Sequence, residues 1–315
     1  MKNKKVSIIA PCFNEEKNID IFYDNILAVF SNLQDYTYEL IFVDDASSDE
    51  TVNQIKKIIN NDKKVKLVVN ARNYGVYKNS FNGIQYATGE VLVPMLPVDL
   101  QDPPELIREF LKKWEIGDKI IIGTRKDREE FFLKRFIRSV YYKIAKKFSD
   151  FNLIEYGGEF GLLDKSIYKQ LLDFNDYYPY TRGLIASLSN DISTVPYVWK
   201  KRKQGKSNYS LFNYYDHAIN GIVSTSRNIL RRFIFIGLMS SVVLFLAISY
   251  QIFSFLFYDR TLIPPGTLTI LIVLSFISVF LLISLSLISE YIVAIHSQVR
   301  NNIGVVEKEI VNISN

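Results

Sequence analysis

Two long uncharged apolar segments near the C-terminal end constrain the fold of this chain more than any other feature. Residues 233–257 contain no charged side chain, and neither do residues 267–289. Each segment is longer than the roughly 20 residues that an α-helix needs to cross about 30 Å of hydrocarbon. The alternative is a pair of buried helices in a soluble core, but such long uncharged runs are uncommon there. The sequence therefore predicts two transmembrane helices.

The flanking residues predict how these two helices are arranged in the membrane. The link 258–266 is short and contains two prolines and a glycine, so the helices should form a hairpin with an external link. Arginines lie before the first segment and after the second, whereas the link has one Arg balanced by one Asp. The positive-inside rule then keeps both termini cytoplasmic, including a tail over 290–315. The first residues lead directly into a strand-like run rather than a secretory signal.

The region before the membrane segments alternates short β-rich runs with helical patterns. This alternation predicts βαβ units around a mainly parallel, Rossmann-like sheet, hence an α/β domain. The predicted strands are 6–10, 38–43, 65–69 and 91–95, the first of them stopped by Pro11, and helices are expected up to about residue 32, around 50–60 and at 78–87. Acidic residues follow several of these strands, at the edge where open α/β sheets bind ligands.

Composition and missing motifs exclude several classes of site. Neither a G-x-G-x-x-G dinucleotide fingerprint nor a G-x-x-x-x-G-K-[ST] phosphate loop is present. One cysteine and two distant histidines exclude a disulfide and make a zinc site or a histidine triad improbable. Any metal must therefore be held by carboxylates, a hard oxygen-ligand site that suits Mg²⁺ or Mn²⁺. The net charge of +5 suits an anionic partner.

A series of motifs resembles the inverting family 2 glycosyltransferases of GT-A fold, especially dolichol-phosphate mannose synthase and bacterial polyprenyl-phosphate glycosyltransferases. The matching stretches, in chain order, are Ile9–Glu16, Val43–Asp49, Arg72–Gly75, Asp99–Glu105, Gly123–Arg125, Gly158–Phe160, Arg182–Leu184 and Gly205–Ser210. Together with the hairpin they cover nearly the whole chain. The resemblance implies a cytosolic GT-A domain over 1–207, a juxtamembrane helix over 208–232 and the membrane hairpin after it.

The resemblance also implies roles for individual residues. The nucleotide-binding positions are Pro11, Asn14, Glu15, Asp44, Asp45, Asn73 and Gly75. The metal ligands are Asp99 and Gln101, and the lipid-phosphate ligands are Arg125, Arg135, Ser139 and Arg202. Asp99, Arg125 and Glu159 are the catalytic candidates. A basic segment over about 131–148, interleaved with apolar residues, resembles an interfacial amphipathic helix that binds anionic headgroups.

Several of these motifs have a purely structural alternative. The acidic run from Asp44 to Glu50 is also a good helix N-cap cluster. The Asp-Pro-Pro sequence ending at Pro104 is also a common helix start. The basic segment over 131–148 is alternatively a solvated face over an ordinary core. In each case the surrounding motif set favours the functional interpretation.

The sequence departs from the family pattern at several positions, among them Glu159, which stands where G-D-F-R has Asp. Pro97 replaces an expected metal-binding Asp, Val76 replaces a common Lys, and Gly161 ends the motif that usually reads G-D-F-R. Mg²⁺ often binds through one or two carboxylates plus substrate phosphates, so we expect weaker metal binding rather than none. A lipid phosphate has a second pKa of about 6 and is already nucleophilic, which removes the need for a general base. Glu159 is then expected to orient the acceptor or balance the arginines.

The resulting expectation is an enzyme in the bacterial cytoplasmic membrane that moves a sugar from a nucleotide donor, UDP-linked by family habit, to polyprenyl phosphate. Its partners would be nucleotide sugar, lipid phosphate, membrane and other copies of the chain, with tetramers known among relatives, but no nucleic acid. A glycan-chain or hydroxyl-acceptor transferase remains an alternative, although two spans provide no obvious polymer channel. A non-catalytic membrane scaffold is the third, disfavoured by the retained Asp45, Asp99, Gln101, Arg125 and Arg202.

Overall fold

A computed structural model describes residues 4–127, 154–174, 179–200, 266–299 and 304–313, with single positions between 239 and 257. The chain divides into two compact units, one built from the N-terminal part plus Asn302–Asn315 and the other mainly from Ile222–Asn301. The elements are β1 (Lys4–Cys12), α1 (Ile19–Ser31), β2 (Tyr36–Asp44), α2 (Thr51–Asn61), β3 (Val65–Asn70), α3 (Val76–Ile84), β4 (Val91–Val93), η1 (Pro104–Leu106), α4 (Ile107–Glu115), β5 (Ile120–Asp127), β6 (Gly157–Asp164), α6 (Lys165–Leu172), α7 (Thr181–Leu188), β7 (Ser193–Val198), α10 (Gly266–Val299) and β8 (Glu307–Val311).

The first unit contains a mixed sheet in the order β7-β5-β6-β4-β1-β2-β3-β8. Strands β4, β1, β2 and β3 run parallel to one another, and β5 pairs in parallel with β7. Strand β6 runs antiparallel to both β4 and β5, and β8 runs antiparallel to β3. The predicted α/β domain with a mainly parallel sheet is therefore confirmed. Because β6 reverses direction between β4 and β5, its first residues lie at the same edge as the ends of the parallel strands.

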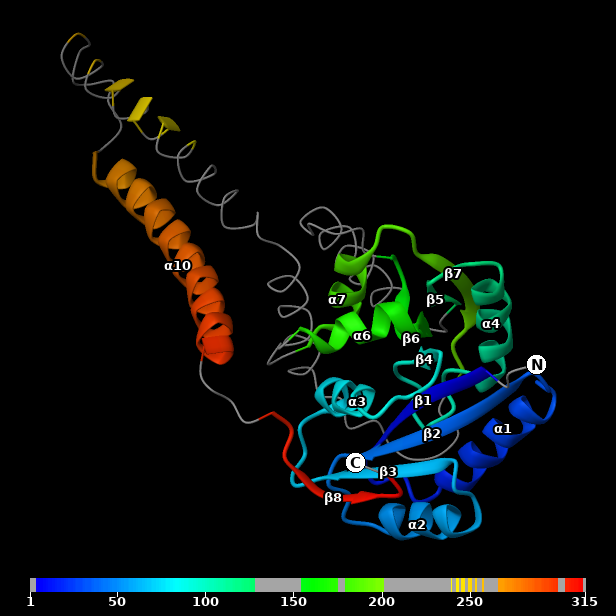
Figure 1. The fold of residues 1–315 in the computed structure, drawn as a ribbon. Helices are drawn as coiled ribbons and strands as arrows, with labels where there is room; N and C mark the ends of the chain where they lie inside the picture. Colours follow the sequence, from blue (N-terminus) through cyan, green and yellow to red (C-terminus); the bar gives the residue numbers. More distant parts are fainter. Residues whose placement is uncertain are drawn as a thin grey trace. The chain divides into compact units, whose positions relative to one another are not determined.

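Helices cover both faces of this sheet, as expected for βαβ units. One buried cluster joins α1, α2 and α4 to one face, and a second joins α3, α6 and α7 to the other. Figure 1 shows α1 and α2 on the opposite side of the strands from α3 and α6. Residues of β1 alternate between the clusters, with Ile8 in the first and Ile9 in the second. That alternation follows the two-residue period of side chains along a strand.

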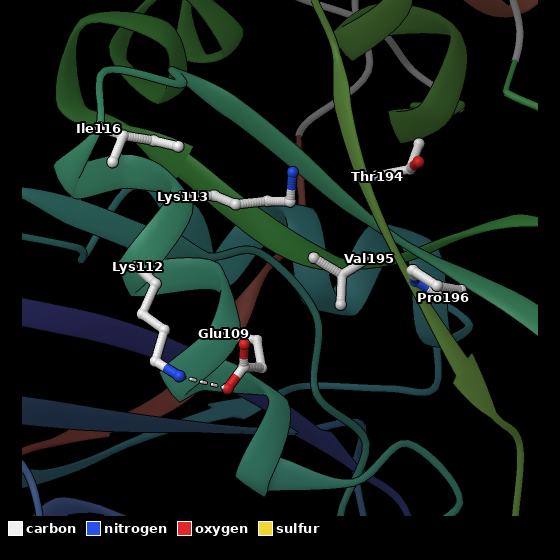
Figure 2. A pocket seen from close by; sticks show the side chains of 7 residues that line it. All are labelled: Glu109, Lys112, Lys113, Ile116, Thr194, Val195 and Pro196. Atoms are coloured by element: carbon white, nitrogen blue, oxygen red, sulfur yellow. Dashed lines mark hydrogen bonds and ion pairs between the residues drawn. The ribbon is translucent and has the colours of Figure 1, made fainter.

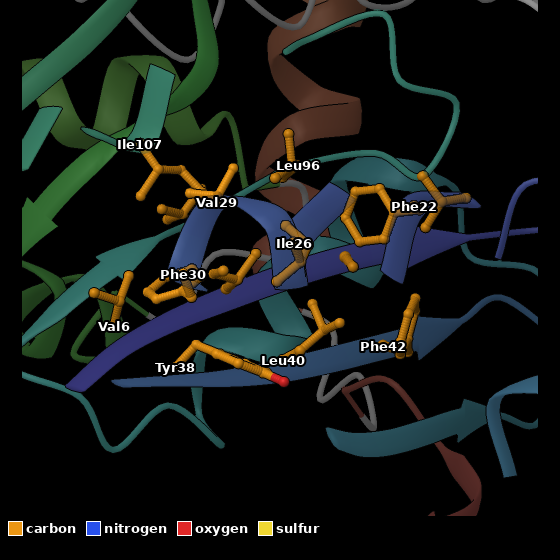
Figure 3. Packing of buried hydrophobic residues seen from close by; sticks show 14 of the residues in the cluster. Val6, Phe22, Ile26, Val29, Phe30, Tyr38, Leu40, Phe42, Leu96 and Ile107 are labelled. Carbon is orange, nitrogen blue, oxygen red and sulfur yellow. The ribbon is translucent and has the colours of Figure 1, made fainter. Parts of the chain in front are cut away.

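Helix α1 shows how the first cluster is packed. Its apolar side chains, three or four residues apart, lie on β2, with Phe22 against Phe42 at 6.0 Å between ring centroids and Phe30 against Tyr38 at 5.0 Å (Figure 3). Ile26 is completely buried between them. Fully burying one such side chain contributes roughly 1.5–3 kcal/mol. The helix therefore fixes the positions of β1 and β2, whose ends carry much of the predicted site.

Several predicted boundaries are wrong: the strand predicted over 91–95 ends at Val93, and the helix predicted at 78–87 is Val76–Ile84. The first strand does not stop at Pro11 but continues to Cys12, with Pro11 in register with Val43. Strand β4 pairs with β1 only from Val6 to Ile8, so Pro11 lies beyond the part of β1 that is paired on both sides. A missing amide hydrogen costs little there, because the neighbouring ladder has already ended.

Helix α10 holds the second predicted membrane span. Its segment Val273–Val293 has a mean hydropathy of 2.2 and is long and apolar enough to cross a membrane. Most of the first predicted span, 233–257, lies outside the described residues, as do the juxtamembrane helix over 208–232 and the basic segment over 131–148. The two-helix hairpin thus stays a prediction. The tail predicted over 290–315 instead contains β8, an edge strand of the sheet.

Candidate functional site

The loops after β1 and β2 are tied together by hydrogen bonds. The Asn14 side-chain oxygen accepts from the Ser48 amide at 2.8 Å, and the Asn14 amide donates to the Ser47 hydroxyl at 2.8 Å. The backbone of Asn14 is left-handed, with φ 54°, a conformation that Asn tolerates better than most residues. The Glu15 amide donates to the Thr51 hydroxyl at 2.8 Å. Asn14 and Glu15, both predicted nucleotide ligands, therefore belong to one rigid double loop.

Asp44 closes the turn at the end of β2. The side chain is completely buried and accepts hydrogen bonds from both the amide (2.9 Å) and the hydroxyl of Ser47. Burial raises the pKa of Asp44, and the bonds from Ser47 oppose that rise. The N-cap of the helix that follows is Glu50, whose side chain makes no capping bond, while Asp49 before it accepts from the Thr51 amide at 3.0 Å. The acidic run therefore has a structural role in these turns, and its predicted role in nucleotide binding stays a prediction.

Asp45 holds the turn that follows β3. One carboxylate oxygen accepts from the Tyr74 amide at 2.8 Å and from the Asn70 side chain at 3.0 Å, and the other accepts from the Gly75 amide at 2.8 Å. Gly75 has φ 88°, so a residue without a Cβ suits this position. Asn73 lies exposed on the same turn and accepts from the Gly75 amide at 3.1 Å. The structure therefore places Asp45, Asn73 and Gly75 together, as predicted.

Sequence reasoning missed two buried asparagines that support this turn. Asn70 ends β3 and donates to the side chain of Asn79 on α3 at 2.8 Å, as well as to Asp45. Asn79 in turn donates to the Val43 carbonyl at 2.6 Å. Each is essentially excluded from solvent. An amide at the end of an apolar strand, before the R-N-x-G turn, was the available signal.

The candidate metal ligands lie on the loop after β4. Asp99 accepts from the Gln101 amide at 3.2 Å, and Gln101 donates its side-chain amide to the Lys200 carbonyl at 3.2 Å. The Lys200 amide donates back to the Gln101 carbonyl at 3.0 Å. These bonds orient Gln101 through its nitrogen and leave its side-chain oxygen as the atom suited to a hard cation.

This donor set fits a divalent cation that also binds a substrate phosphate. Within the described ranges, no group of three or more His, Cys, Asp or Glu side chains is arranged to hold a metal. One carboxylate and one amide oxygen, from Asp99 and Gln101, agree with the mode in which Mg²⁺ takes few protein ligands plus phosphate oxygens and water. The proline at position 97 is consistent with this sparse site.

A buried ion pair connects this loop to β5. Arg125 binds the Asp102 carboxylate through Nη2, at 2.9 and 3.1 Å, and more distantly through Nε at 3.3 Å. The Tyr197 hydroxyl donates to Asp102 and accepts from Arg125 Nε at 2.9 Å. The guanidinium also lies 5.2 Å from the centre of the Trp199 ring. Burial alone would lower the pKa of Arg125, but the Asp102 charge raises it, so the side chain remains a cation.

A second buried pair lies beside the first. Glu159, on β6, accepts from Arg182 Nε at 2.8 Å and from Nη2 at 3.2 Å. The Glu159 side chain is 7% exposed. The Glu159 charge also helps to raise the pKa of Arg125, which places its carboxylate within electrostatic reach of both arginines. This agrees with the expectation that Glu159 balances arginines.

The described site residues lie at one end of the sheet, the edge formed by the carboxyl ends of the parallel strands. The ends of β1, β2, β4 and β5 and the beginning of β6 all lie there, because β6 is antiparallel to its neighbours. This edge therefore carries the nucleotide candidates, the metal candidates, Arg125 and Glu159. Arg135, Ser139 and Arg202 lie outside the described residues, so their roles stay predictions.

A pocket elsewhere contains none of the predicted site residues. It has a volume of about 300 Å³ and lies between α4 and β7 (Figure 2). Its lining residues are Glu109, Lys112, Lys113, Ile116, Thr194, Val195 and Pro196. Glu109 and Lys112 pair with each other at 2.9 Å along the helix. The pocket is shallow and open, and we assign it no part in the site.

Known proteins resemble this chain in sequence along most of its length. The glycosyltransferase CsbB of Bacillus subtilis is 30% identical over 316 residues, covering 100% of this chain and 94% of that protein. A prophage-derived bactoprenol glucosyl transferase of Shigella flexneri is 29% identical, covering 94% of this chain and 95% of its own length.

The fold also resembles solved glycosyltransferase structures. The mannosyltransferase PcManGT from Pyrobaculum calidifontis, solved with GDP-Man and Mn²⁺, superposes with a TM-score of 0.51 at 16% identity, covering 96% of this chain and 89% of that one. This similarity supports the GT-A fold. The sequence model of glycosyl transferase family 2 matches residues 7–172, which contain the sheet edge described above. The chain therefore belongs to glycosyl transferase family 2.

Proposed function

We propose that this glycosyltransferase moves a sugar from a nucleotide donor, UDP-linked, to polyprenyl phosphate at the cytoplasmic face of a bacterial membrane. Relatives named bactoprenol glucosyl transferases match it along more than nine-tenths of both chains. The observation that carries the proposal is the shared sheet edge, where the nucleotide candidates adjoin a metal loop and two arginines. The product would serve cell-envelope glycan modification.

The chemistry proposed is a single displacement at the anomeric carbon with inversion. An oxygen of the lipid phosphate forms the new bond while the bond to the nucleoside diphosphate breaks. At pH 7 the phosphate is largely dianionic, so no side chain needs to remove a proton. Glu159, bound to Arg182, is placed to hold an arginine rather than to act as a base. Positioning and charge compensation then supply most of the rate.

Different described residues would bind the nucleotide, the cation and the acceptor phosphate. Asp45 and the Asn73–Gly75 turn would border the nucleotide, and Asp99 with Gln101 would hold a divalent cation. When bound, that cation would neutralise charge on the departing diphosphate. Arg125 would present its guanidinium to the acceptor phosphate from an orientation set by Asp102, since arginine is suited to forked bonds with phosphate.

The position of β8 supports the proposed hairpin. Strands β7 and β8 belong to the same sheet, yet they precede and follow the apolar helix α10. A chain that leaves a domain and re-enters it on the same side of a bilayer crosses an even number of times. If α10 spans the membrane, a second crossing is needed between β7 and α10, and the predicted span 233–257 would supply it. Both termini would then be cytoplasmic.

The test is transfer by the purified full-length protein in lipid nanodiscs. Undecaprenyl phosphate, Mg²⁺ or Mn²⁺ and a panel of nucleotide sugars would be supplied, and the lipid product identified by mass spectrometry. We expect a lipid-linked monosaccharide from one donor, and none with Asp99→Asn. A wild-type protein that glycosylates a hydroxyl acceptor but never the lipid phosphate would disprove the acceptor assignment. One that binds no nucleotide in the presence of metal would indicate a scaffold.

A further inference from the structure

The last described strand lies against the turn that Asp45 holds. β8 pairs antiparallel with β3, and Glu307 stands opposite Asn70. Beyond the end of β3 the contact continues, because the Ala71 amide donates to the Val306 carbonyl at 2.8 Å. The Val306 amide then donates to the Tyr74 hydroxyl at 3.1 Å. The segment that follows the membrane-spanning part thus reaches the candidate donor turn directly.

Glu307 fastens the same strand to helix α3, which begins at that turn. One carboxylate oxygen accepts from Asn82 at 2.8 Å and from Gln85 at 3.4 Å, and the other accepts from the Tyr86 hydroxyl at 2.6 Å. Burial and the bond to Glu307 raise the pKa of Tyr86, so its hydroxyl remains a donor at neutral pH. One partly buried carboxylate therefore joins β8 to Asn82 on α3 and to Gln85 and Tyr86 directly after the end of that helix.

The Arg72–Gly75 turn is consequently held from two sides. On one side Asp45 binds the amides of Tyr74 and Gly75. On the other side Val306 binds the hydroxyl of Tyr74, whose ring lies 4.2 Å from the Arg72 guanidinium carbon. Tyr74 is the link, because its backbone faces the carboxylate and its side chain faces β8. Movement of β8 would break the hydrogen bond between Val306 and Tyr74 and leave the bonds to Asp45 in place.

We propose that the C-terminal strand positions the donor-binding turn, with Glu307 and Tyr74 as positioning residues. This inference rests on the proposed function insofar as the turn binds the nucleotide sugar. The strand is a required part of the donor site, although its residues touch neither the donor nor the acceptor. The strand that follows helix α10 in the sequence is thereby the one that contacts the candidate donor turn.

The same strand offers a matched control. Glu309 is two residues from Glu307, on the same strand, but pairs with Lys56 of α2 at 2.7 Å. Both side chains of that pair are more than a third exposed. Glu309→Ala also removes a carboxylate from β8. In the part of the chain that the structure describes, however, this carboxylate pairs with Lys56 and not with the turn or α3. Surface pairs of this kind contribute little to stability.

The first measurement needs no substrate. Hydrogen exchange of the full-length protein in nanodiscs would follow peptides that cover residues 70–77. We expect Glu307→Ala and Tyr74→Phe to accelerate exchange in this segment, with Glu309→Ala matching the wild type. Tyr74→Phe keeps the ring beside Arg72 and removes only the hydroxyl. Equal exchange in all four proteins would overturn the inference.

The second measurement separates positioning from simple destabilisation. With UDP-glucose and undecaprenyl phosphate, Glu307→Ala and Tyr74→Phe, which lose three hydrogen bonds and one, should each raise the donor KM roughly three- to tenfold while kcat stays nearly constant. Glu307→Gln keeps an oxygen acceptor for Asn82 and should restore most of the affinity. A fall in kcat with an unchanged donor KM would contradict the inference. If the wild type transfers no sugar but exchange still distinguishes Glu307 from Glu309, the proposed function fails and the positioning of the turn stands.

Discussion

The two halves of the candidate site hold their carboxylates in different ways. On the proposed donor side, Asp44 and Asp45 accept hydrogen bonds from backbone amides, the Ser47 hydroxyl, the Cys12 thiol and the Asn70 side chain, all of which are uncharged. On the proposed acceptor side, Asp102 and Glu159 each face an arginine. All four carboxylates are buried. The carboxylates of the two halves are therefore similarly buried, but only Asp102 and Glu159 are paired with a cationic side chain.

This difference indicates what each half is prepared to receive. Uncharged donors fix the shape of the proposed donor side without supplying a counter-charge, which suits hydroxyl groups and a cation. The acceptor-side arginines are already oriented and partly neutralised, so a dianionic phosphate arriving there needs further positive charge. Arg135 and Arg202, outside the described residues, are the predicted sources of that charge.

The largest effect should come from breaking an acceptor-side pair. Asp102→Ala leaves Arg125 buried without its counter-ion, and breaking a buried pair in this way costs about 3–5 kcal/mol. Urea unfolding followed by tryptophan fluorescence would measure the loss. The double variant Asp102→Ala, Arg125→Ala is the control, and its stability should fall less than that of Asp102→Ala alone. A single variant as stable as the double would show that the charge is not effectively buried.

A smaller effect is expected on the donor side. Asp45→Asn replaces one acceptor oxygen by a donor that faces a backbone amide, and it leaves no cation unpaired. We expect a loss of about 1–3 kcal/mol, the cost of an unsatisfied buried group. The same unfolding measurement applies, with Glu309→Ala as the exposed control. A loss equal to that of Asp102→Ala would remove the proposed distinction between the halves.

The smallest effect on stability should follow removal of metal. Asp99 and Gln101 offer few ligands, so we expect the free protein to bind metal weakly. A cation present at a concentration near its Kd then adds only about 0.4 kcal/mol to the free energy of unfolding. A chelator should therefore hardly change the melting temperature of the free protein, yet it should stop sugar transfer. In the presence of UDP, the chelator should lower the melting temperature measurably. A large shift without nucleotide would reveal a metal site that these two residues do not explain.

The donor side was largely predictable from sequence, because its residues follow strands directly. Once β1 and β2 were recognised as parallel neighbours, Asn14 and Asp45 had to lie at the same edge. The supporting amides Asn70 and Asn79 were not predicted. A polar residue in an apolar pattern shows only that a partner is needed, and does not say which residue provides it.

The acceptor side was predicted less completely, because its contacts depend on which distant strands become neighbours. Arg125 was assigned to the lipid phosphate, but its bonds to Asp102 and Tyr197 require β5 and β7 to adjoin the metal loop. The pairing of Glu159 with Arg182 depends likewise on tertiary placement. β8 was missed because its five residues are mostly exposed and charged, without the alternation that marks a half-buried strand.

The late position of β8 in the chain has a consequence for biogenesis. The outer side of β3 remains an open edge until residues 307–311 have left the ribosome, after all of helix α10. Open strand edges are templates for unwanted pairing between molecules. If α10 inserts into a bilayer as proposed, it emerges during synthesis before the strand that covers the edge of β3, so the sheet is still incomplete when insertion begins. If that insertion failed, two features that favour aggregation would be exposed at once: the apolar helix α10 and the unpaired edge of β3.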